Sequence, residues 1–184
     1  GLLYLPNDGS GNFGPAVRMI SDTIPYFSYF AVADFTGDGL ADVMTEDGTR
    51  NTQVFINKGV GQLFEKNTLP ASPNHLLHDL EAGDVDGDGK VDILTGAGPG
   101  ADPHVKVFSG ADGTQKQSFD AFATSFNGGV SVASADLNQD GKADIIAGTQ
   151  TQSAQVKAFN ATDLSVIDDF FAFQGAVGVW VAGK

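Results

Sequence analysis

The chain of 184 residues is long enough for a substantial hydrophobic core, since 41% of its residues are hydrophobic and only 18% are charged. This balance indicates a folded chain and excludes an acidic disordered tail. The formal net charge of −13 at pH 7 argues against nucleic-acid binding, which needs a cationic face. The chain has no cysteine, so disulfides cannot stabilise it, and no apolar run approaches the roughly 20 residues of a membrane-spanning helix.

Three acidic segments of nine residues share one pattern of residue types. They begin at Asp34, Asp84 and Asp136, so their starts lie 50 and 52 residues apart. Each has aspartate at positions one, five and nine, glycine at position six and an oxygen-bearing side chain at position three. A near-constant period indicates a repeat architecture in which every copy has the same structural role.

Strand signals surround each acidic segment in the same order. A stretch rich in small residues precedes it, which suits a strand in a crowded interior, and an apolar, largely β-branched run follows it. A third strand, turn residues and a fourth strand ending in aromatic residues come next. The first strands are predicted at 29–33, 79–83 and 131–135, the second at 43–44, 93–95 and 145–147, and the third at 53–56, 104–108 and 155–159. Helical periodicity is absent, so the sequence predicts an all-β fold.

Four short antiparallel strands per roughly 50 residues are typical of one blade of a β-propeller. A blade that is apolar on both faces needs neighbours to cover it, so isolated repeats should not be stable. We predict about three full four-stranded antiparallel blades with half blades at each end. Their expected extents are 1–24 for the C-terminal half of a preceding blade, 25–72, 73–124 and 125–173 for blades 1 to 3, and 174–184 for the first strand of a following blade.

The two ends of the chain repeat parts of a blade. Residues 2–13 resemble 54–64, the third strand and hairpin of blade 1, and residues 178–184 match 129–135, the strand before the third acidic segment. We therefore expect a mature or excised segment of a larger propeller, with no signal peptide visible in its first residues. A closed ring of four blades that uses both half blades is the alternative.

The acidic segments have the composition of calcium-binding loops. Calcium takes six to eight oxygen ligands, and oxygens at alternate positions of a tightly curled loop can converge on one ion. A backbone carbonyl at position seven explains why leucine or lysine is tolerated there, and glycine at position six allows a sharp turn. The predicted ligands are Asp34, Thr36, Asp38, Leu40 and Asp42 in loop 1, Asp84, Asp86, Asp88, Lys90 and Asp92 in loop 2, and Asp136, Asn138, Asp140, Lys142 and Asp144 in loop 3.

EF-hands and ordinary turns also contain aspartate and glycine. An EF-hand closes with a bidentate glutamate at position twelve between two helices, whereas position twelve here is Thr45, Thr95 or Ala147 and strands follow. Ordinary turns also prefer aspartate and glycine, but three loops with the same ligand spacing favour a shared binding role. We expect three Ca²⁺ ions, whose six positive charges would change the net charge from −13 to −7.

Residues 83–98 resemble an FG-GAP repeat, the blade unit of integrin α-subunit propellers. Blade 1, with residues 57–64, resembles the related VCBS repeat of bacterial surface proteins, and residues 96–100 with 103–108 resemble a variant of large bacterial extracellular proteins. The resemblance covers nearly the whole chain and implies a propeller with one Ca²⁺ in each loop between the first and second strands. Thr36 and Gln139 depart from the usual pattern, so we expect weaker binding in loops 1 and 3 than in loop 2, which has four carboxylates.

The expected function follows from these loops. Calcium loops of low affinity fill at the roughly millimolar calcium found outside cells, which favours a secreted or cell-surface protein, bacterial by its resemblance. We expect a calcium-stabilised structural, adhesive or ligand-binding module whose partners are an unknown protein or glycan and neighbouring blades of the same or another chain. The alternatives are a lectin-like carbohydrate-binding propeller and the non-catalytic scaffold of a secreted polysaccharide-degrading enzyme.

Catalysis by the chain itself is not expected. The three histidines are His75, His78 and His104, and no nucleophile motif, phosphate-binding loop or zinc spacing accompanies them. His78 and Asp79 are neighbours on a predicted strand and should point to opposite faces. Trp180 and the aromatic run 170–173 could bind a sugar, but we expect them to pack between blades.

Overall fold

The computed structural model describes residues 3–5, 9–18, 30–46, 52–59, 64–68, 77–175 and 177–183. These residues form fourteen β-strands and no helix, which confirms the predicted all-β class. It follows that the described ranges contain no helix able to span a membrane.

Twelve strands form three antiparallel sheets of four strands, which confirms the predicted four-stranded antiparallel blades. In each sheet the strands lie side by side in chain order. The first sheet contains β3 (Phe30–Ala33), β4 (Asp42–Glu46), β5 (Thr52–Ile56) and β6 (Glu65–Thr68). The second contains β7 (Leu77–Gly83), β8 (Asp92–Ala97), β9 (His104–Phe108) and β10 (Gln115–Asp120). The third contains β11 (Val130–Ala135), β12 (Asp144–Thr149), β13 (Gln155–Phe159) and β14 (Val166–Phe171).

The other two strands, β1 (Leu3–Tyr4) and β2 (Val17–Arg18), form a short antiparallel ladder near the N-terminus. The boundaries predicted at 24/25 and 72/73 lie outside the described residues. The boundaries at 124/125 and 173/174 fall between sheets or after β14, and the extents of the blades stay predictions.

Each acidic loop joins the first two strands of its sheet. The ladders between these strands end at the pairs Ala33↔Asp42, Gly83↔Asp92 and Ala135↔Asp144. The last aspartate of each loop is therefore also the first residue of the second strand, opposite the residue that precedes the loop. The three loops occupy equivalent ends of the three sheets.

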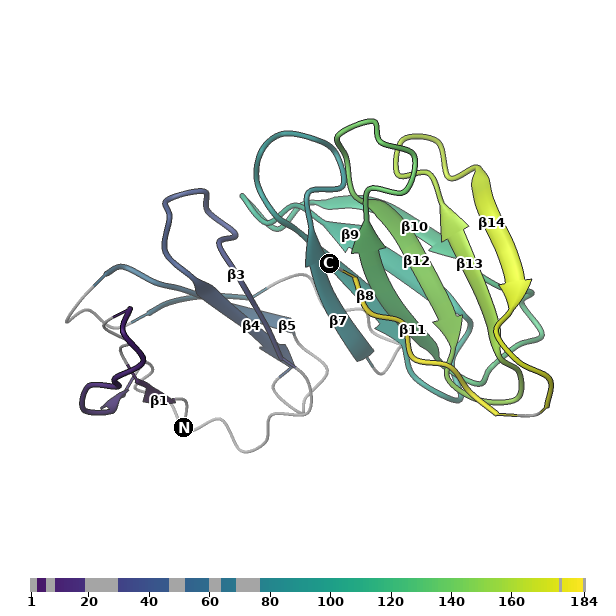
Figure 1. Cartoon of the computed structure of the whole chain (residues 1–184), viewed down its shortest axis with the longest axis horizontal. Coiled ribbons are helices and arrows are strands. Elements are labelled where there is room, and N and C mark those ends of the chain that lie inside the picture. Colours follow the sequence, from purple (N-terminus) through teal and green to yellow (C-terminus); the bar gives the residue numbers. More distant parts are fainter. Residues whose placement is uncertain are drawn as a thin grey trace.

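The sheets lie next to one another in the order of the chain (Figure 1), and β7 contacts β3 on one side and β11 on the other. Small residues allow these first strands to approach closely. A Cβ atom on Gly83 would lie 2.3 Å from Ser134 Oγ, and one on Gly96 would lie 2.3 Å from the carbonyl oxygen of Val130. Ser134 Oγ also donates a hydrogen bond to the Ala82 carbonyl at 3.1 Å. The small-residue stretches of the sequence thus lie where neighbouring blades come closest.

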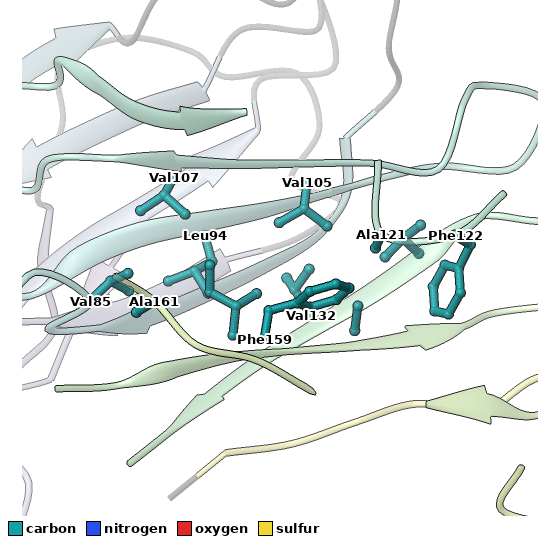
Figure 2. Packing of buried hydrophobic residues seen from close by; sticks show 12 residues of the cluster. Val85, Leu94, Val105, Val107, Ala121, Phe122, Val132, Phe159 and Ala161 are labelled. Atoms are coloured by element: carbon teal, nitrogen blue, oxygen red, sulfur yellow. The ribbon is translucent and has the colours of Figure 1, made fainter. Parts of the chain in front are cut away.

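Apolar side chains fill the space between the second and third sheets (Figure 2). The rings of Phe119 and Phe159 meet edge to face in this layer, with centroids 5.0 Å apart. The buried members are Val85, Leu94, Val105, Val107, Ala121, Phe122, Val130, Val132, Ile145, Ala147, Phe159 and Ala161. Such inter-sheet layers are what a blade with two apolar faces requires.

A smaller apolar layer lies between the first and second sheets. Its buried members are Phe35, Met44, Val54, Ile56, Leu80, Ile93 and Phe108. The second residue of each of the first two loops takes part in the layers: Phe35 of loop 1 is 0% exposed and Val85 of loop 2 is 2% exposed. Leu137, the second residue of loop 3, is 44% exposed. Loops 1 and 2 are therefore anchored in the apolar layers by their own side chains.

Residues 177–183 run along the third sheet without forming a strand. The Val179 N–H donates to the Thr149 carbonyl at 2.8 Å, and Ser131 Oγ donates to the Val179 carbonyl at 3.0 Å. A Cβ atom on Gly148 would lie 3.2 Å from Val179 Cγ1, so this glycine leaves room for the segment, as Gly96 does for β11.

The contrast between Phe35 and Leu137 gives a test of how the loops are anchored. We expect Phe35→Ala to lower the free energy of unfolding by about 3–5 kcal/mol, because it empties a buried ring position. Leu137→Ala, at the same loop position but 44% exposed, should cost less than about 1 kcal/mol. Urea unfolding followed by circular dichroism measures both. Equal losses would contradict a role of this loop position in the layer between sheets.

Candidate metal centre

The three acidic loops share one backbone conformation. Their sixth residues, Gly39, Gly89 and Gly141, have φ angles of +85°, +81° and +87°. Their fourth residues are also left-handed: Gly37 and Gly87 have φ of +76° and +77°, and Gln139 has φ of +63°. Glycine adopts this region without steric cost, whereas glutamine does not. Loop 3 therefore reaches the shared conformation with strain at Gln139.

The first aspartate of each loop accepts hydrogen bonds from backbone N–H groups of the same loop. Asp84 Oδ1 accepts from Gly87 at 2.7 Å and from Asp88 at 3.1 Å, and Asp84 Oδ2 accepts from Gly89 at 3.0 Å. Asp34 has the same pattern, and the N–H of Gly39 is the main cause that lowers the pKa of its carboxyl group. These hydrogen bonds hold each loop in a tight turn around its first carboxylate. Each carboxylate has about four lone-pair sites, so it can also bind a cation.

The third residue differs between the loops. In loop 3 the Asn138 amide donates to Asp140 Oδ2 at 3.1 Å, and in loop 1 Thr36 Oγ1 donates to Asp34 Oδ1 at 3.4 Å. Only loop 2 has a carboxylate, that of Asp86, at this position. The predicted order of affinity, with loop 2 strongest, is in line with these donor sets and stays a prediction.

The ninth residue of each loop is a buried carboxylate. Asp42, Asp92 and Asp144 are 0%, 1% and 0% exposed. Each accepts a hydrogen bond from the N–H of the second loop residue, at 3.0, 3.2 and 3.0 Å. Desolvation is the main cause that raises the pKa of Asp42 and of Asp92. These carboxylates tie the start of each loop to the start of the second strand.

In loops 1 and 3 the hairpin after the third strand satisfies the second oxygen of the buried carboxylate. Asp42 Oδ1 accepts from the Asn57 N–H at 2.7 Å, and Asp144 Oδ1 accepts from the Ala161 N–H at 3.3 Å. For Asp92 the Gly110 N–H of the same hairpin also lowers the pKa of the carboxyl group, but the buried Oδ1 has no hydrogen bond of acceptable geometry within the described chain. The nearest cationic group to that oxygen is the Lys116 ammonium, at 3.4 Å.

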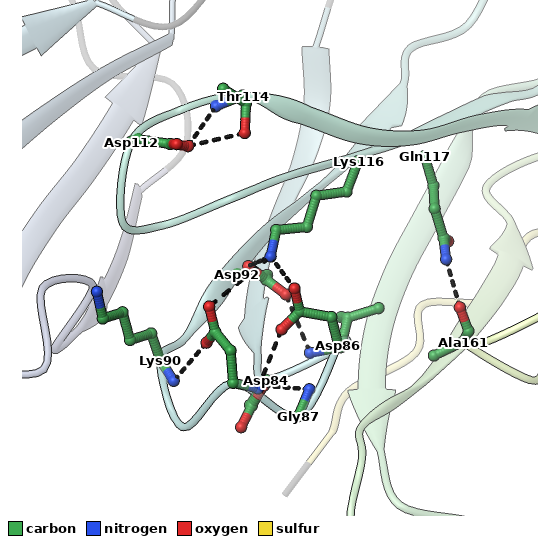
Figure 3. A network of polar contacts seen from close by, with 12 residues as sticks. Asp84, Asp86, Gly87, Lys90, Asp92, Asp112, Thr114, Lys116, Gln117 and Ala161 are labelled. Carbon is green, nitrogen blue, oxygen red and sulfur yellow. Dashed lines mark hydrogen bonds and ion pairs between the residues drawn. The ribbon is translucent and has the colours of Figure 1, made fainter.

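Loop 2 brings three carboxylate side chains together (Figure 3). Oxygen atoms of Asp84, Asp86 and Asp88 all lie within 4.8 Å of one another. Two oxygens bound to one Ca²⁺ at 2.3–2.6 Å can be at most about 5 Å apart. The three carboxylates therefore fit a single calcium ion.

Neighbouring loops are in contact. The Ala143 N–H in loop 3 donates to the Asp84 carbonyl in loop 2 at 2.8 Å. The Lys142 side chain lies over Gly87, where an added Cβ atom would be 3.1 Å from Lys142 Cγ. In the same way Lys90 of loop 2 lies over Gly37 of loop 1, at 3.6 Å. The lysine at position seven of one loop thus covers the fourth residue of the loop before it.

A polar group that the sequence analysis missed lies on β9 and β10. His104 Nδ1 is 2.7 Å from Asp120 Oδ1, and His104 Nε2 is 2.6 Å from Ser118 Oγ. Ser118 and Asp120 are two residues apart on one strand and share a face, and Asp120 pairs directly with His104. That alternation is the signal that could have predicted the contact. His75 lies outside the described residues, as does the side chain of His78.

The equivalent strands of the third sheet indicate a structural role for this group. Gln155 takes the place of His104 there, and its Nε2 donates to Asp169 Oδ1 at 2.7 Å. A glutamine–aspartate pair has neither a serine hydroxyl nor an imidazole, yet it joins the third and fourth strands in the same way. We interpret the serine–histidine–aspartate contact of the second sheet as a cross-strand pair of the same kind.

The aromatic residues at the end of β14 and after it are exposed, so the expectation that they pack between blades is wrong for the described chain. Phe170, Phe173 and Trp180 are 46%, 47% and 59% exposed. Their counterparts in the second sheet, Phe119 and Phe122, pack in the apolar layer because the third sheet covers them.

The comparison with protein families gives a match to the FG-GAP repeat over residues 128–180. The matched segment contains the whole third sheet, β11 to β14, with loop 3. The third blade is therefore similar to the FG-GAP repeat, which confirms the resemblance that the second blade shows in its sequence. The match does not reach the VCBS or integrin features of that resemblance. A search of curated proteins gave no match.

Asp79 is a half-buried carboxyl group outside the loops, at the contact between β7 and β11. Its Oδ2 accepts from the Val132 N–H at 3.0 Å, and its Oδ1 accepts from the Leu80 N–H at 3.1 Å. Burial raises the pKa of Asp79 to about 6, and these N–H donors oppose the rise only in part. Folding therefore favours the protonated form of this group.

The sign of the pH dependence follows. Above pH 6 the Asp79 carboxylate destabilises the fold, and this cost disappears as the pH falls from about 6 towards the unfolded value of 3.8. We expect Asp79→Asn, whose amide oxygen can still accept from Val132, to raise the free energy of unfolding by about 1 kcal/mol at pH 7.5, after allowance for partial exposure. The gain should vanish near pH 4 in urea unfolding.

Asp112 offers a control of opposite sign. The Thr114 N–H is the main cause that lowers the pKa of this exposed carboxyl group. Asp112→Asn should therefore lower stability at pH 7.5 and have less effect at low pH. A stability gain of Asp79→Asn that is equal at pH 4 and pH 7.5 would contradict the role given to its charge.

Proposed function

We propose that the chain is a calcium-stabilised β-propeller module of a secreted or cell-surface protein, with a structural, adhesive or ligand-binding role and no catalytic role. The observation that carries the proposal is loop 2, where three carboxylates lie within 4.8 Å of one another beside a buried oxygen that lacks a hydrogen bond. The FG-GAP match at residues 128–180 supports the same interpretation for loop 3.

The residues that would hold calcium are the fifteen loop positions predicted from the sequence. Bound calcium would supply positive charge among carboxylates that otherwise repel one another across a few ångströms. The chain's own residues do the remaining work. The first aspartate curls each loop, the ninth ties it to the second strand, and Phe35 and Val85 fix loops 1 and 2 in the apolar layers.

Because loops 1 and 2 are coupled to the layers between sheets, calcium binding should stabilise the packing of whole blades. With a dissociation constant about tenfold below the free calcium concentration, one site adds about 1.4 kcal/mol, and three sites add about 4 kcal/mol. Low affinity of this order suits the calcium concentration outside cells and supports secretion or surface display.

Removal of calcium tests the proposal directly. We expect EDTA to lower the melting temperature of the chain by about 8–16 °C relative to millimolar CaCl₂, because about 4 kcal/mol is lost from a chain of this size. Scanning calorimetry with MgCl₂ in place of CaCl₂ is the control, since Mg²⁺ demands a more regular site. The same melting temperature in EDTA and CaCl₂ would contradict the proposal.

The open face of the third sheet supports a neighbouring blade as a partner. Leu137, Phe170 and Phe173 are 44%, 46% and 47% exposed. Their counterparts in the second sheet are Val85, Phe119 and Phe122, all of which pack against the third sheet. The third sheet thus has the same kind of apolar face as the second sheet, but at these three residues no neighbouring blade covers it within the described chain. A blade of the same or another chain fits it, while an exposed aromatic face is also what a carbohydrate-binding propeller would present.

Self-association distinguishes these two partners. If a blade of a second copy covers this face, the sedimentation mass of the chain should rise with concentration, and Phe170→Ser with Phe173→Ser should abolish the rise. Phe171→Ser is the matched control, because Phe171 is 63% exposed but lies on the opposite face of β14. A chain that stays monomeric and binds glycans through Phe170 and Phe173 would instead favour the lectin-like alternative.

A further inference from the structure

Lys116 lies in a β-bulge of the fourth strand of the second sheet. The ladder pairs Phe108 with Gln115 and then Val107 with Gln117, so Lys116 has no partner in the ladder. A β-bulge changes the direction in which the side chain of its extra residue points. The Lys116 side chain points from β10 to loop 2 (Figure 3) and is 21% exposed.

The ammonium group of Lys116 lies among the carboxylates of loop 2. It forms an ion pair with Asp86 Oδ2, and it lies 3.4 Å from Asp92 Oδ1 and 3.9 Å from Asp88 Oδ2. The positive charge therefore occupies the place to which three predicted ligands converge.

The other blades do not repeat this arrangement. The third sheet has the same bulge, because Phe159 pairs with Val166 and Ala158 with Asp168, but the extra residue is the uncharged Ile167. In the first sheet Phe55 pairs with Lys66 and Val54 with Asn67, so the ladder continues without an extra residue. A charged bulge residue is thus a property of the second blade among the three described sheets.

We propose that Lys116 is an internal counter-cation of loop 2 that competes with Ca²⁺ for Asp86, Asp88 and Asp92. The inference rests on the proposed function, because it concerns the same loops. Calcium enters loop 2 in exchange for the ammonium group, so the loop binds calcium more weakly than its four carboxylates would otherwise allow. A lysine is suited to this exchange, because its ammonium is a strongly hydrated point charge on a flexible stem that can return to solvent.

The exchange has a second consequence for the protein without calcium. Lys116 compensates the buried Asp92 oxygen, which has no hydrogen bond within the described chain. Without calcium, loop 2 should therefore be more ordered than its four carboxylates alone would allow. The second blade then depends less on calcium than it would without Lys116.

The test follows calcium binding loop by loop in the whole chain. The backbone amide resonances of Gly89 and Gly141 report loops 2 and 3 separately during a CaCl₂ titration. We expect Lys116→Met, which keeps the stem and removes the charge, to raise the calcium affinity of loop 2 by about three- to tenfold and to leave loop 3 unchanged. The same variant should melt at a lower temperature than the unchanged protein in EDTA.

Three further variants distinguish the effect of a positive charge at the bulge from effects of side-chain shape and of net charge. Lys116→Arg keeps the charge and should leave the calcium affinity of loop 2 as it is in the unchanged protein. Ile167→Lys adds the charge at the equivalent bulge and should weaken loop 3 alone. Lys106→Met, on the neighbouring strand β9, changes the net charge equally and should leave both loops unchanged, which excludes a long-range effect.

The outcomes distinguish this inference from the proposed function. If Gly89 responds to calcium with the same affinity in Lys116→Met, Lys116→Arg and the unchanged protein, the inference is wrong and the calcium function stands. If neither glycine responds in any variant and EDTA leaves the melting temperature unchanged, the proposed function fails and the inference fails with it. Well-dispersed amide spectra establish that each variant is folded.

Discussion

The buried carboxylate at the end of each acidic loop is the constraint on which the blades depend. A charge that is removed from water is costly unless hydrogen bonds compensate it. In loops 1 and 3 the compensation comes from two backbone N–H groups, one at the second loop residue and one in the hairpin after the third strand. One aspartate thereby joins three strands of its sheet, and the neighbouring second residue of loops 1 and 2 enters the apolar layer. The loops are part of the packing of the blades and not appendages to it.

Much of the fold could be predicted because its signals are local and repeat. The period of about 50 residues, the turn residues and the small-residue stretches predict four strands per blade, and three such sheets are present. Glycine at the sixth loop position predicts a sharp turn, and Gly39, Gly89 and Gly141 have positive φ. The spacing of loop oxygens likewise predicts that Asp84, Asp86 and Asp88 converge, and their oxygens lie within 4.8 Å.

Other features depend on contacts that no local pattern encodes. The bulge that directs the Lys116 side chain toward loop 2 depends on the register between β9 and β10. A shift of one residue would turn this side chain to the other face of the sheet. The contact of His104 with Ser118 and Asp120 also requires the register. Burial of Phe119 and exposure of Phe170, at equivalent places, depend on whether another sheet covers the face. Both positions are phenylalanine, so only the arrangement of the sheets explains why one side chain packs in the apolar layer and the other is exposed.

The number of carboxylates in a loop does not by itself measure how strongly the loop attracts a cation, because neighbouring charges also act on that cation. Loops 1 and 3 each have three aspartates, and loop 2 has four. The ammonium of Lys116 lies within 4.0 Å of Asp86, Asp88 and Asp92, so the four carboxylates of loop 2 and this lysine together carry the same formal charge as three carboxylates. The fourth carboxylate and Lys116 then offset each other in the electrostatics of the second blade. What distinguishes loop 2 is that the positive charge opposite its additional carboxylate belongs to the protein and sits on a flexible side chain.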